Sequence, residues 1–178
     1  FSSSLKSLAS NLLNLCHDLK FMSSGPKAGI SEITLPAVQP GSSIMPGKVN
    51  PGVPECMEMI CLQVLGNDHS IGLAAQKSQL ELNVYCPLIM TNILGSMQIL
   101  SNGLQMLVSY CLENIEVNQE RIRELFDGSL CTATALAPIL GYAQTADIVK
   151  SALTKKSTLK AEVLSRKLLS EAQINKLL

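Results

Sequence analysis

Leucines recur at intervals of three and four along the first part of the chain. This spacing puts side chains on one face of an α-helix, which turns once in about 3.6 residues. The residues concerned are Leu5, Leu8, Leu12, Leu15 and Leu19. The pattern predicts an amphipathic helix that runs to about Met22 and ends before Gly25 and Pro26, because glycine and proline terminate helices.

A long loop is expected to follow this helix. Residues 23–52 are rich in Gly, Pro and Ser, and their prolines exclude any long helix. Loops of this length in compact proteins are usually functional or disordered. A second helix is expected to start near Val53 or Pro54, since proline is tolerated in a first turn, and to run toward Ser78.

A third apolar and strongly helical stretch extends from about Leu82 to Asn114, with Pro87 in or near its first turn. Aromatic residues make up only 3% of the sequence, and β-branched residues do not alternate along these stretches. Leu, Met and Ala are therefore expected to fill the core. Long helices of this composition are typical of a helix bundle.

The composition changes after Glu116, where shorter helical segments begin. They are expected at residues 119–126, 145–154 and 170–178, separated by Gly128, Pro138 and Gly141. The sequence thus predicts an all-α fold with two domains. Residues 1–117 would form part of a long-helix bundle that includes the loop, and residues 118–178 would form a small helical C-terminal domain.

The charge balance narrows the possible partners. Fourteen Lys and Arg residues match fourteen Asp and Glu residues, so no summed positive charge favours nucleic acid or an anionic membrane. Charged or amide residues also interrupt every apolar stretch before it reaches the length of a membrane span. We therefore expect neither a nucleic-acid partner nor a membrane partner.

The first residues and the cysteines indicate a cytoplasmic protein. The N-terminal segment lacks the basic flank and apolar core of a secretory signal, and because it begins with Phe1 it is expected to lie inside a longer protein. Six cysteines show no Cys-x-x-Cys pair, and each of the two histidines, His17 and His69, favours a structural role over metal binding. We expect free thiols, no metal site and no cofactor.

The most informative segment is residues 41–51, which read GSSIMPGKVNP. On composition alone, this segment is well interpreted as an ordinary loop rich in Gly, Ser and Pro, in which the lysine has no functional role. However, it gathers two hydroxyls, an ammonium and a carboxamide just before a helix N-terminus, whose unpaired N–H groups attract anions. A small carboxylate would suit this arrangement. Proton removal beside a carboxylate creates a dianion, which needs fixed donors and a cation for its stabilisation.

The segment resembles the Gly-Ser-Ser-x-x-Pro-x-Lys-x-Asn motif of the fumarase/aspartase superfamily. Six positions match: Gly41, Ser42, Ser43, Pro46, Lys48 and Asn50. The resemblance extends from the helix before Gly25 to the C-terminus and so covers nearly the whole chain. It implies the central helical bundle of such a lyase, followed by its small C-terminal domain.

Residue by residue, the resemblance implies specific roles. The catalytic base falls on Ser42, a choice between Ser42 and Ser43 that the chemistry of the loop alone leaves open. Ser43, Lys48 and Asn50 would surround the substrate carboxylate that becomes the aci-carboxylate, under a mobile loop. Glu55 matches a glutamate that pairs with an active-site histidine from another segment, although an acid at a helix start is an equally good interpretation of it.

The resemblance also implies an assembly. Family members build each active site from three subunits of a homotetramer, and they carry the histidine and other substrate-binding segments upstream of the part matched here. This chain alone is therefore expected to be inactive.

Flanking segments look more like aspartate ammonia-lyases than fumarases. They are residues 52–55, 66–68, 74–75 and 79–84, while departures at Lys27, Ser78 and Ala137 indicate a divergent member. The predicted reaction is the reversible deamination of L-aspartate to fumarate and ammonia, with a small dicarboxylate as substrate. The alternatives are fumarate hydratase, which forms fumarate from L-malate, and a non-catalytic member of the superfamily.

Overall fold

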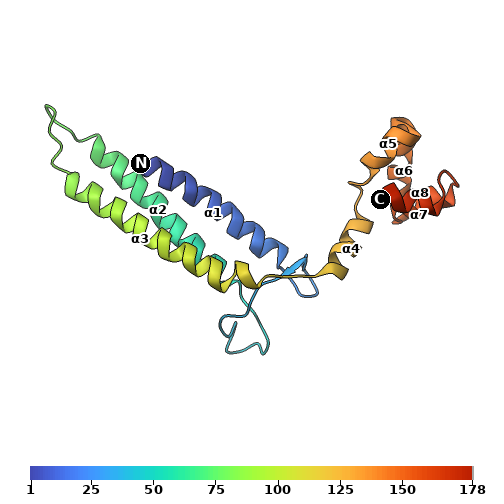
Figure 1. Ribbon diagram of the computed structural model, residues 1–178, viewed down its shortest axis with the longest axis horizontal. Helices are drawn as coiled ribbons and strands as arrows, with labels where there is room; N and C mark the ends of the chain where they lie inside the picture. The colour runs from blue at the N-terminus through green and yellow to red at the C-terminus, as the bar shows by residue number, and fades with distance from the viewer. Residues whose placement is uncertain (178) are drawn as a thin grey trace. The chain divides into compact units, whose positions relative to one another are not determined.

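The computed structural model describes residues 1–177, and its regular secondary structure is almost entirely helical (Figure 1). The chain divides into two compact units, Phe1–Asn118 and Gln119–Leu178. The expected all-α fold, with a long-helix bundle and a small helical C-terminal part, is confirmed. Within residues 1–177, no helix is both long enough and apolar enough to cross a membrane.

Three long helices build the first unit: α1 (Ser2–Met22), α2 (Gly52–Ala75) and α3 (Cys86–Tyr110). They run alternately up and down, and α2 packs against both of its neighbours (Figure 1). Their shared core is apolar and free of large aromatic side chains. Its fully buried members include Ala9, Cys16, Met57, Cys61 and Leu107.

The buried face of α1 differs in part from the expected leucine face. Leu12 and Leu19 are buried as predicted, but Leu8 and Leu15 are 40% and 41% exposed. Ala9 and Cys16, which are fully buried, share this face with Leu12 and Leu19. The leucine periodicity therefore covers a wider arc than the surface that α2 buries.

The end of the second predicted helix and the start of the third need correction. Pro54 lies in the first turn of α2 as expected, but α2 ends at Ala75 instead of continuing toward Ser78. The third helix starts at Cys86, not at Leu82. The amides of Gln79 and Leu82 each donate to the other residue's carbonyl oxygen at 2.9 Å, which forms a tight turn in the chain before α3.

A short antiparallel ladder ties the loop after α1 to the end of the bundle. Strand β1 (Ile33–Thr34) pairs with β2 (Glu116–Val117), and Ile33 lies opposite Val117. The predicted uninterrupted loop at residues 23–52 therefore contains a strand. The third helix also ends earlier than predicted, at Tyr110 instead of about Asn114. The 3₁₀ turn η1 (Leu112–Asn114) follows it.

The second unit contains five helices within the described residues. They are α4 (Gln119–Gly128), α5 (Ala133–Leu140), α6 (Tyr142–Lys155), α7 (Leu159–Ser165) and α8 (Glu171–Leu177). Pro138 was expected to separate helices, but it lies inside α5, and neither α5 nor α7 was predicted. The last residue of the helix expected at 170–178, Leu178, lies outside the described residues.

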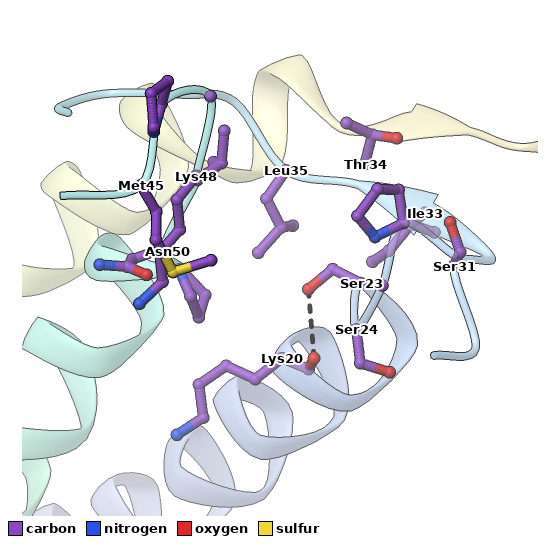
Figure 2. A pocket seen from close by; sticks show the side chains of 16 residues that line it. Lys20, Ser23, Ser24, Ser31, Ile33, Thr34, Leu35, Met45, Lys48 and Asn50 are labelled. Carbon is purple, nitrogen blue, oxygen red and sulfur yellow. Dashed lines mark hydrogen bonds between the residues drawn. The ribbon is translucent and has the colours of Figure 1, made fainter. Parts of the chain in front are cut away.

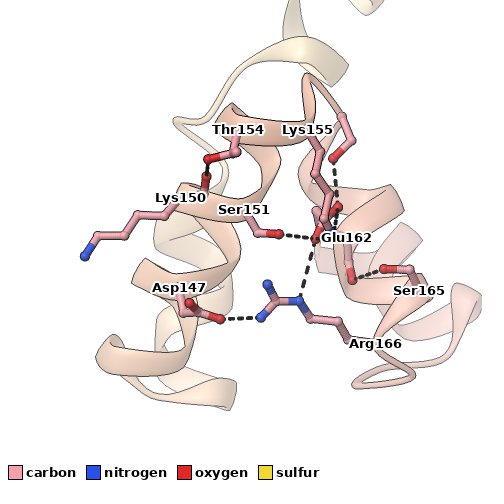
Figure 3. A network of polar contacts seen from close by, with 9 residues as sticks. Asp147, Lys150, Ser151, Thr154, Lys155, Glu162, Ser165 and Arg166 are labelled. Carbon is pink, nitrogen blue, oxygen red and sulfur yellow. Dashed lines mark hydrogen bonds and ion pairs between the residues drawn. The ribbon is translucent and has the colours of Figure 1, made fainter.

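A buried carboxylate joins α6 to α7 in this unit (Figure 3). Glu162 is 4% exposed and accepts hydrogen bonds from Ser151, Lys155 and Ser157, while Arg166 lies 3.6 Å away. These donors, chiefly the Ser151 hydroxyl and the Lys155 ammonium, lower the pKa of Glu162 to about 2. The ionised carboxylate therefore links the two helices at neutral pH.

Candidate functional site

The segment that carries the motif is a loop closed by its own hydrogen bonds. The carboxamide nitrogen of Asn50 donates to the carbonyl oxygen of Gly41 at 2.7 Å. The Gly41 amide in turn donates to the carbonyl oxygen of Lys48 at 3.0 Å. These two bonds join the ends of the loop immediately before α2, so residues 41–50 form a self-contained unit.

Close contact at the loop base requires a glycine at position 41. A Cβ atom at Gly41 would lie 2.1 Å from the carbonyl oxygen of Lys48 and 2.6 Å from its carbonyl carbon. No side-chain rotation relieves an overlap with backbone atoms. The fold of the loop therefore explains why the motif begins with a glycine.

The hydroxyl of Ser42 lies inside this loop and accepts two backbone hydrogen bonds. The amide of Ile44 donates to its Oγ at 3.1 Å, and the amide of Met45 donates at 3.2 Å. Two fixed N–H donors at one oxygen are the arrangement that stabilises an oxyanion. The loop can thus stabilise a Ser42 alkoxide, the species that a serine needs to become in order to act as a base.

Ser43 differs from Ser42 in this respect. Its side chain is exposed, and among residues 1–177 no hydrogen bond to its hydroxyl is found. The structure thus distinguishes two serines that were chemically equivalent in the sequence. The assignment of Ser42 as the base remains a prediction.

A pocket of about 720 Å³ lies between this loop, the end of α1 and the segment that leads into β1 (Figure 2). Lys48 and Asn50 line it, as do Met45 and the residues between Met45 and Pro51. Ser42 and Ser43 do not line it. The structure thus brings together two of the predicted carboxylate ligands on one cavity and leaves the predicted base on a neighbouring part of the loop.

Two lysines line the pocket, Lys20 and Lys48. No aspartate or glutamate lines the pocket in the described part of the chain. Lys20 is held by Glu58 of α2 at 2.6 Å, whereas Lys48 is exposed and forms no ion pair with any residue from 1 to 177. Such a pocket favours an anion.

Sequence reasoning missed Lys20. It lies in the last turn of α1, where a lysine is common because it complements the helix dipole, so nothing in the local pattern marked it. The signal that could have found it is its position just before the Gly-Pro segment, which the fold brings beside the motif loop.

Glu55 lies in the first turn of α2 and is exposed. It does not line the pocket, and no hydrogen bond or ion pair joins its side chain to another residue between 1 and 177. Residues 1–177 also contain no cluster of His, Cys, Asp or Glu side chains arranged to hold a metal ion.

The buried cysteines belong to the core, where burial raises the pKa of the Cys16 thiol to about 11.

Two family models match this chain. Residues 1–66 match the model described as Lyase, and residues 133–178 match the model described as Fumarase C C-terminus. The first match covers α1, the motif loop and the beginning of α2, and the second covers α5 to the C-terminus. Together they include the pocket and most of the second unit.

Known proteins support the same relationship. Fumarate hydratase class II of Brucella suis is 44% identical over 177 residues, which are 99% of this chain and 38% of that protein. Aspartate ammonia-lyase of Pseudomonas aeruginosa is 45% identical over 174 residues, 98% of this chain and 37% of that protein. The crystal structure of class II fumarase from Schistosoma mansoni superposes with a TM-score of 0.92 at 39% identity, covering 99% of this chain and 37% of that one.

This chain therefore spans well under half the length of the curated relatives that it matches. Both kinds of relative keep their similarity across the bundle, the loop and the C-terminal helices. The family models and these relatives together show that the chain belongs to the fumarase/aspartase superfamily.

Proposed function

We propose that this chain supplies the serine-bearing loop of a class II fumarate hydratase, which interconverts L-malate with fumarate and water. The observation that carries the proposal is the Ser42 hydroxyl, which accepts two loop amides beside the cationic pocket of Lys48 and Asn50. The predominance of the name fumarate hydratase class II among close relatives supports this reaction over the deamination that the flanking segments favoured.

In the proposed reaction, the Ser42 alkoxide removes a proton from the carbon next to one substrate carboxylate. The electron pair moves into that carboxylate and forms an aci-carboxylate with two negative charges. Lys48, Asn50 and Ser43 stabilise the added charge, which exceeds that of the bound substrate. Loss of hydroxide, protonated as it leaves, then gives fumarate and water.

The loop amides explain how a serine can serve as the base. A free serine hydroxyl is far too weak an acid at neutral pH, so its anion must be stabilised by the protein. The amides of Ile44 and Met45 provide this stabilisation without any ordering cost during the reaction. Because Ser42 lies outside the lining of the pocket that Lys48 and Asn50 share, we propose that the loop rearranges to bring Ser42 to the substrate.

The assembly expected for this family is also a proposal here. Many large apolar side chains of α1, α2 and α3 are exposed, among them Leu8, Leu15, Met59, Leu62, Leu88 and Leu94. Apolar surfaces of this extent mark protein contacts. We propose that they pack in a homotetramer, in which Glu55 meets a histidine from another segment and completes the site.

Aspartate ammonia-lyase is the second candidate, because one close relative of nearly equal identity has that activity in its name. It would use the same loop and the same aci-carboxylate, with ammonia as the leaving group. The non-catalytic alternative is less favoured, because a decayed site has no need for the loop bonds at Ser42, Lys48 and Asn50.

The test is to measure fumarate formation by its ultraviolet absorbance, with L-malate and L-aspartate in parallel, using the full-length protein. We expect kcat/KM for L-malate to exceed that for L-aspartate by about a hundredfold or more, since a site built for one leaving group leaves its polar groups unpaired with the other. Faster turnover of L-aspartate would instead establish the ammonia-lyase. Turnover of neither substrate would support the non-catalytic alternative.

A further inference from the structure

A second cavity lies within the C-terminal unit, between α4, α7 and α8. Its volume is about 370 Å³, and residues of this unit line it. Phe126 and Asp127 belong to α4, Leu159 and Lys160 to α7, and Asn175 to α8. A cavity of this size can hold a small organic molecule.

The cavity carries one cation and one anion that are not paired with each other. The ammonium of Lys160 donates a hydrogen bond of 2.6 Å to Oδ1 of Asn175, which is a neutral side chain. Asp127 is exposed, and between residues 1 and 177 no hydrogen bond or ion pair joins its carboxylate to another side chain. Both charges are therefore available to a ligand.

Two apolar side chains share the cavity with these charges. Leu159 is 1% exposed, whereas Phe126 is left 46% exposed. A large aromatic side chain that stays this exposed beside a cavity gains apolar contact when a ligand covers it. The lining thus offers apolar contact in addition to a cation and an anion.

This combination selects among classes of ligand. A dicarboxylate or a polyphosphate would bring several negative charges to a lining that holds a single lysine and the carboxylate of Asp127. A neutral apolar molecule would desolvate both charges without giving either a partner. A zwitterion with an apolar side chain satisfies the cation, the anion and the apolar surface together.

We propose that this cavity binds a free α-amino acid with an apolar side chain. Lys160 binds its carboxylate, Asp127 binds its ammonium group, and Phe126 and Leu159 contact its side chain. The site shares no residue with the pocket of Lys48 and Asn50, so it does not depend on which reaction the protein catalyses.

The experiment measures binding by calorimetry in the full-length protein at neutral pH. The ligands are L-leucine and two analogues that each lack one charge: 4-methylpentanoate lacks the ammonium group, and 3-methylbutylamine lacks the carboxylate. We expect L-leucine to bind about tenfold more tightly than either analogue, because charge-assisted hydrogen bonds form at both ends.

Variants assign each charge to its partner. Asp127→Asn should abolish the advantage of L-leucine over 4-methylpentanoate, and Lys160→Met should abolish its advantage over 3-methylbutylamine. Lys160→Arg should keep most of that advantage, because it keeps the cation. A purely structural role would instead weaken all three ligands equally.

Three control variants remove charges that lie outside the cavity. They are Glu120→Gln on α4, Lys176→Met on α8, and Lys48→Ala in the motif loop. Each should change the affinity for L-leucine by less than about twofold. A large loss in Lys48→Ala would mean that L-leucine binds at the motif loop, and a large loss in either other control would mean a general effect of charge; both outcomes would overturn the proposal.

The proposal would also be overturned if L-leucine failed to bind or bound no better than its analogues. An equal loss of all three ligands in Asp127→Asn and Lys160→Met would have the same consequence. Should Lys160→Met fail to fold, the comparison of Lys160→Gln with Lys160→Arg answers the same question.

Discussion

The carboxamide of Asn50 donates a 2.7 Å hydrogen bond to the carbonyl oxygen of Gly41, and this bond joins the two ends of the motif loop. The first and last residues of the Gly-Ser-Ser-x-x-Pro-x-Lys-x-Asn motif are thus in direct contact. The spacing of the motif therefore has a structural meaning besides its chemical one. It sets the length of the loop that this hydrogen bond closes.

Gly41→Ala tests this closed loop. The new Cβ would overlap the carbonyl of Lys48, so the loop base must open and displace Ser42. We expect kcat/KM of the full-length enzyme to fall by about a hundredfold, because a displacement of catalytic groups by about an ångström is enough for a loss of this size. Gly72→Ala is the control, because a Cβ at that exposed helical position meets nothing within 4 Å. Equal activity of the two variants would contradict the account.

Lys48→Ala tests the electrostatic role of the free ammonium. The cation faces charge that grows on the carboxylate in the transition state, so kcat should fall by about 10² to 10³ while KM changes much less. Steady-state kinetics with L-malate measure both quantities. A change confined to KM would mean that Lys48 binds substrate and transition state equally well, and the proposed charge stabilisation would then be wrong.

Acid should destabilise the C-terminal unit through Glu162. The folded protein holds the pKa of Glu162 at about 2, below its ordinary value of 4.5. The unfolded chain therefore binds a proton at higher pH than the folded chain does, and the contribution to stability is complete above about pH 4.5 and lost as the pH falls toward 2.

Thermal unfolding of Glu162→Gln and of the parent protein between pH 5 and pH 2 measures this contribution. The variant should unfold at a lower temperature at pH 5 and lose less stability on acidification. Asp147→Asn is the control, since Asp147 also binds Arg166 but is mostly exposed. A parallel pH dependence in Glu162→Gln and the parent would exclude Glu162 as the acid-sensitive group.

Much of the first unit follows from local sequence signals. The leucine spacing of α1 and the proline in the first turn of α2 are properties of single helices, so the sequence predicts them well. The predicted start of α3 at Leu82 was wrong because Leu82 closes a turn with Gln79. Within this turn Leu80 and Glu81 adopt positive φ angles of 46° and 63°, which residues other than glycine rarely adopt. Tertiary context imposes this turn, and local propensity does not report it.

The candidate site likewise combines residues that the sequence identifies with features that only the three-dimensional structure shows. The motif identified Lys48 and Asn50, which the structure brings to one pocket, and it singled out Ser42, whose two amide donors depend on the fold of the loop. Lys20 was missed because it is distant from the loop in the sequence and lines the same pocket only in the folded chain.

Pro138 misled the helix prediction, because prolines usually end helices. In the interior of α5 it removes only one backbone donor of a helix eight residues long.

The most direct test of the account is the turnover of Ser42→Ala beside Ser43→Ala in the full-length enzyme, with L-malate as substrate. Ser42→Ala removes the base and should lower kcat by several orders of magnitude, about 10³ or more, with assembly unchanged. Ser43→Ala removes a hydroxyl that lacks the amide donors and should lower kcat far less. Near-normal turnover of Ser42→Ala, or a larger loss in Ser43→Ala, would contradict the assignment of Ser42 as the base.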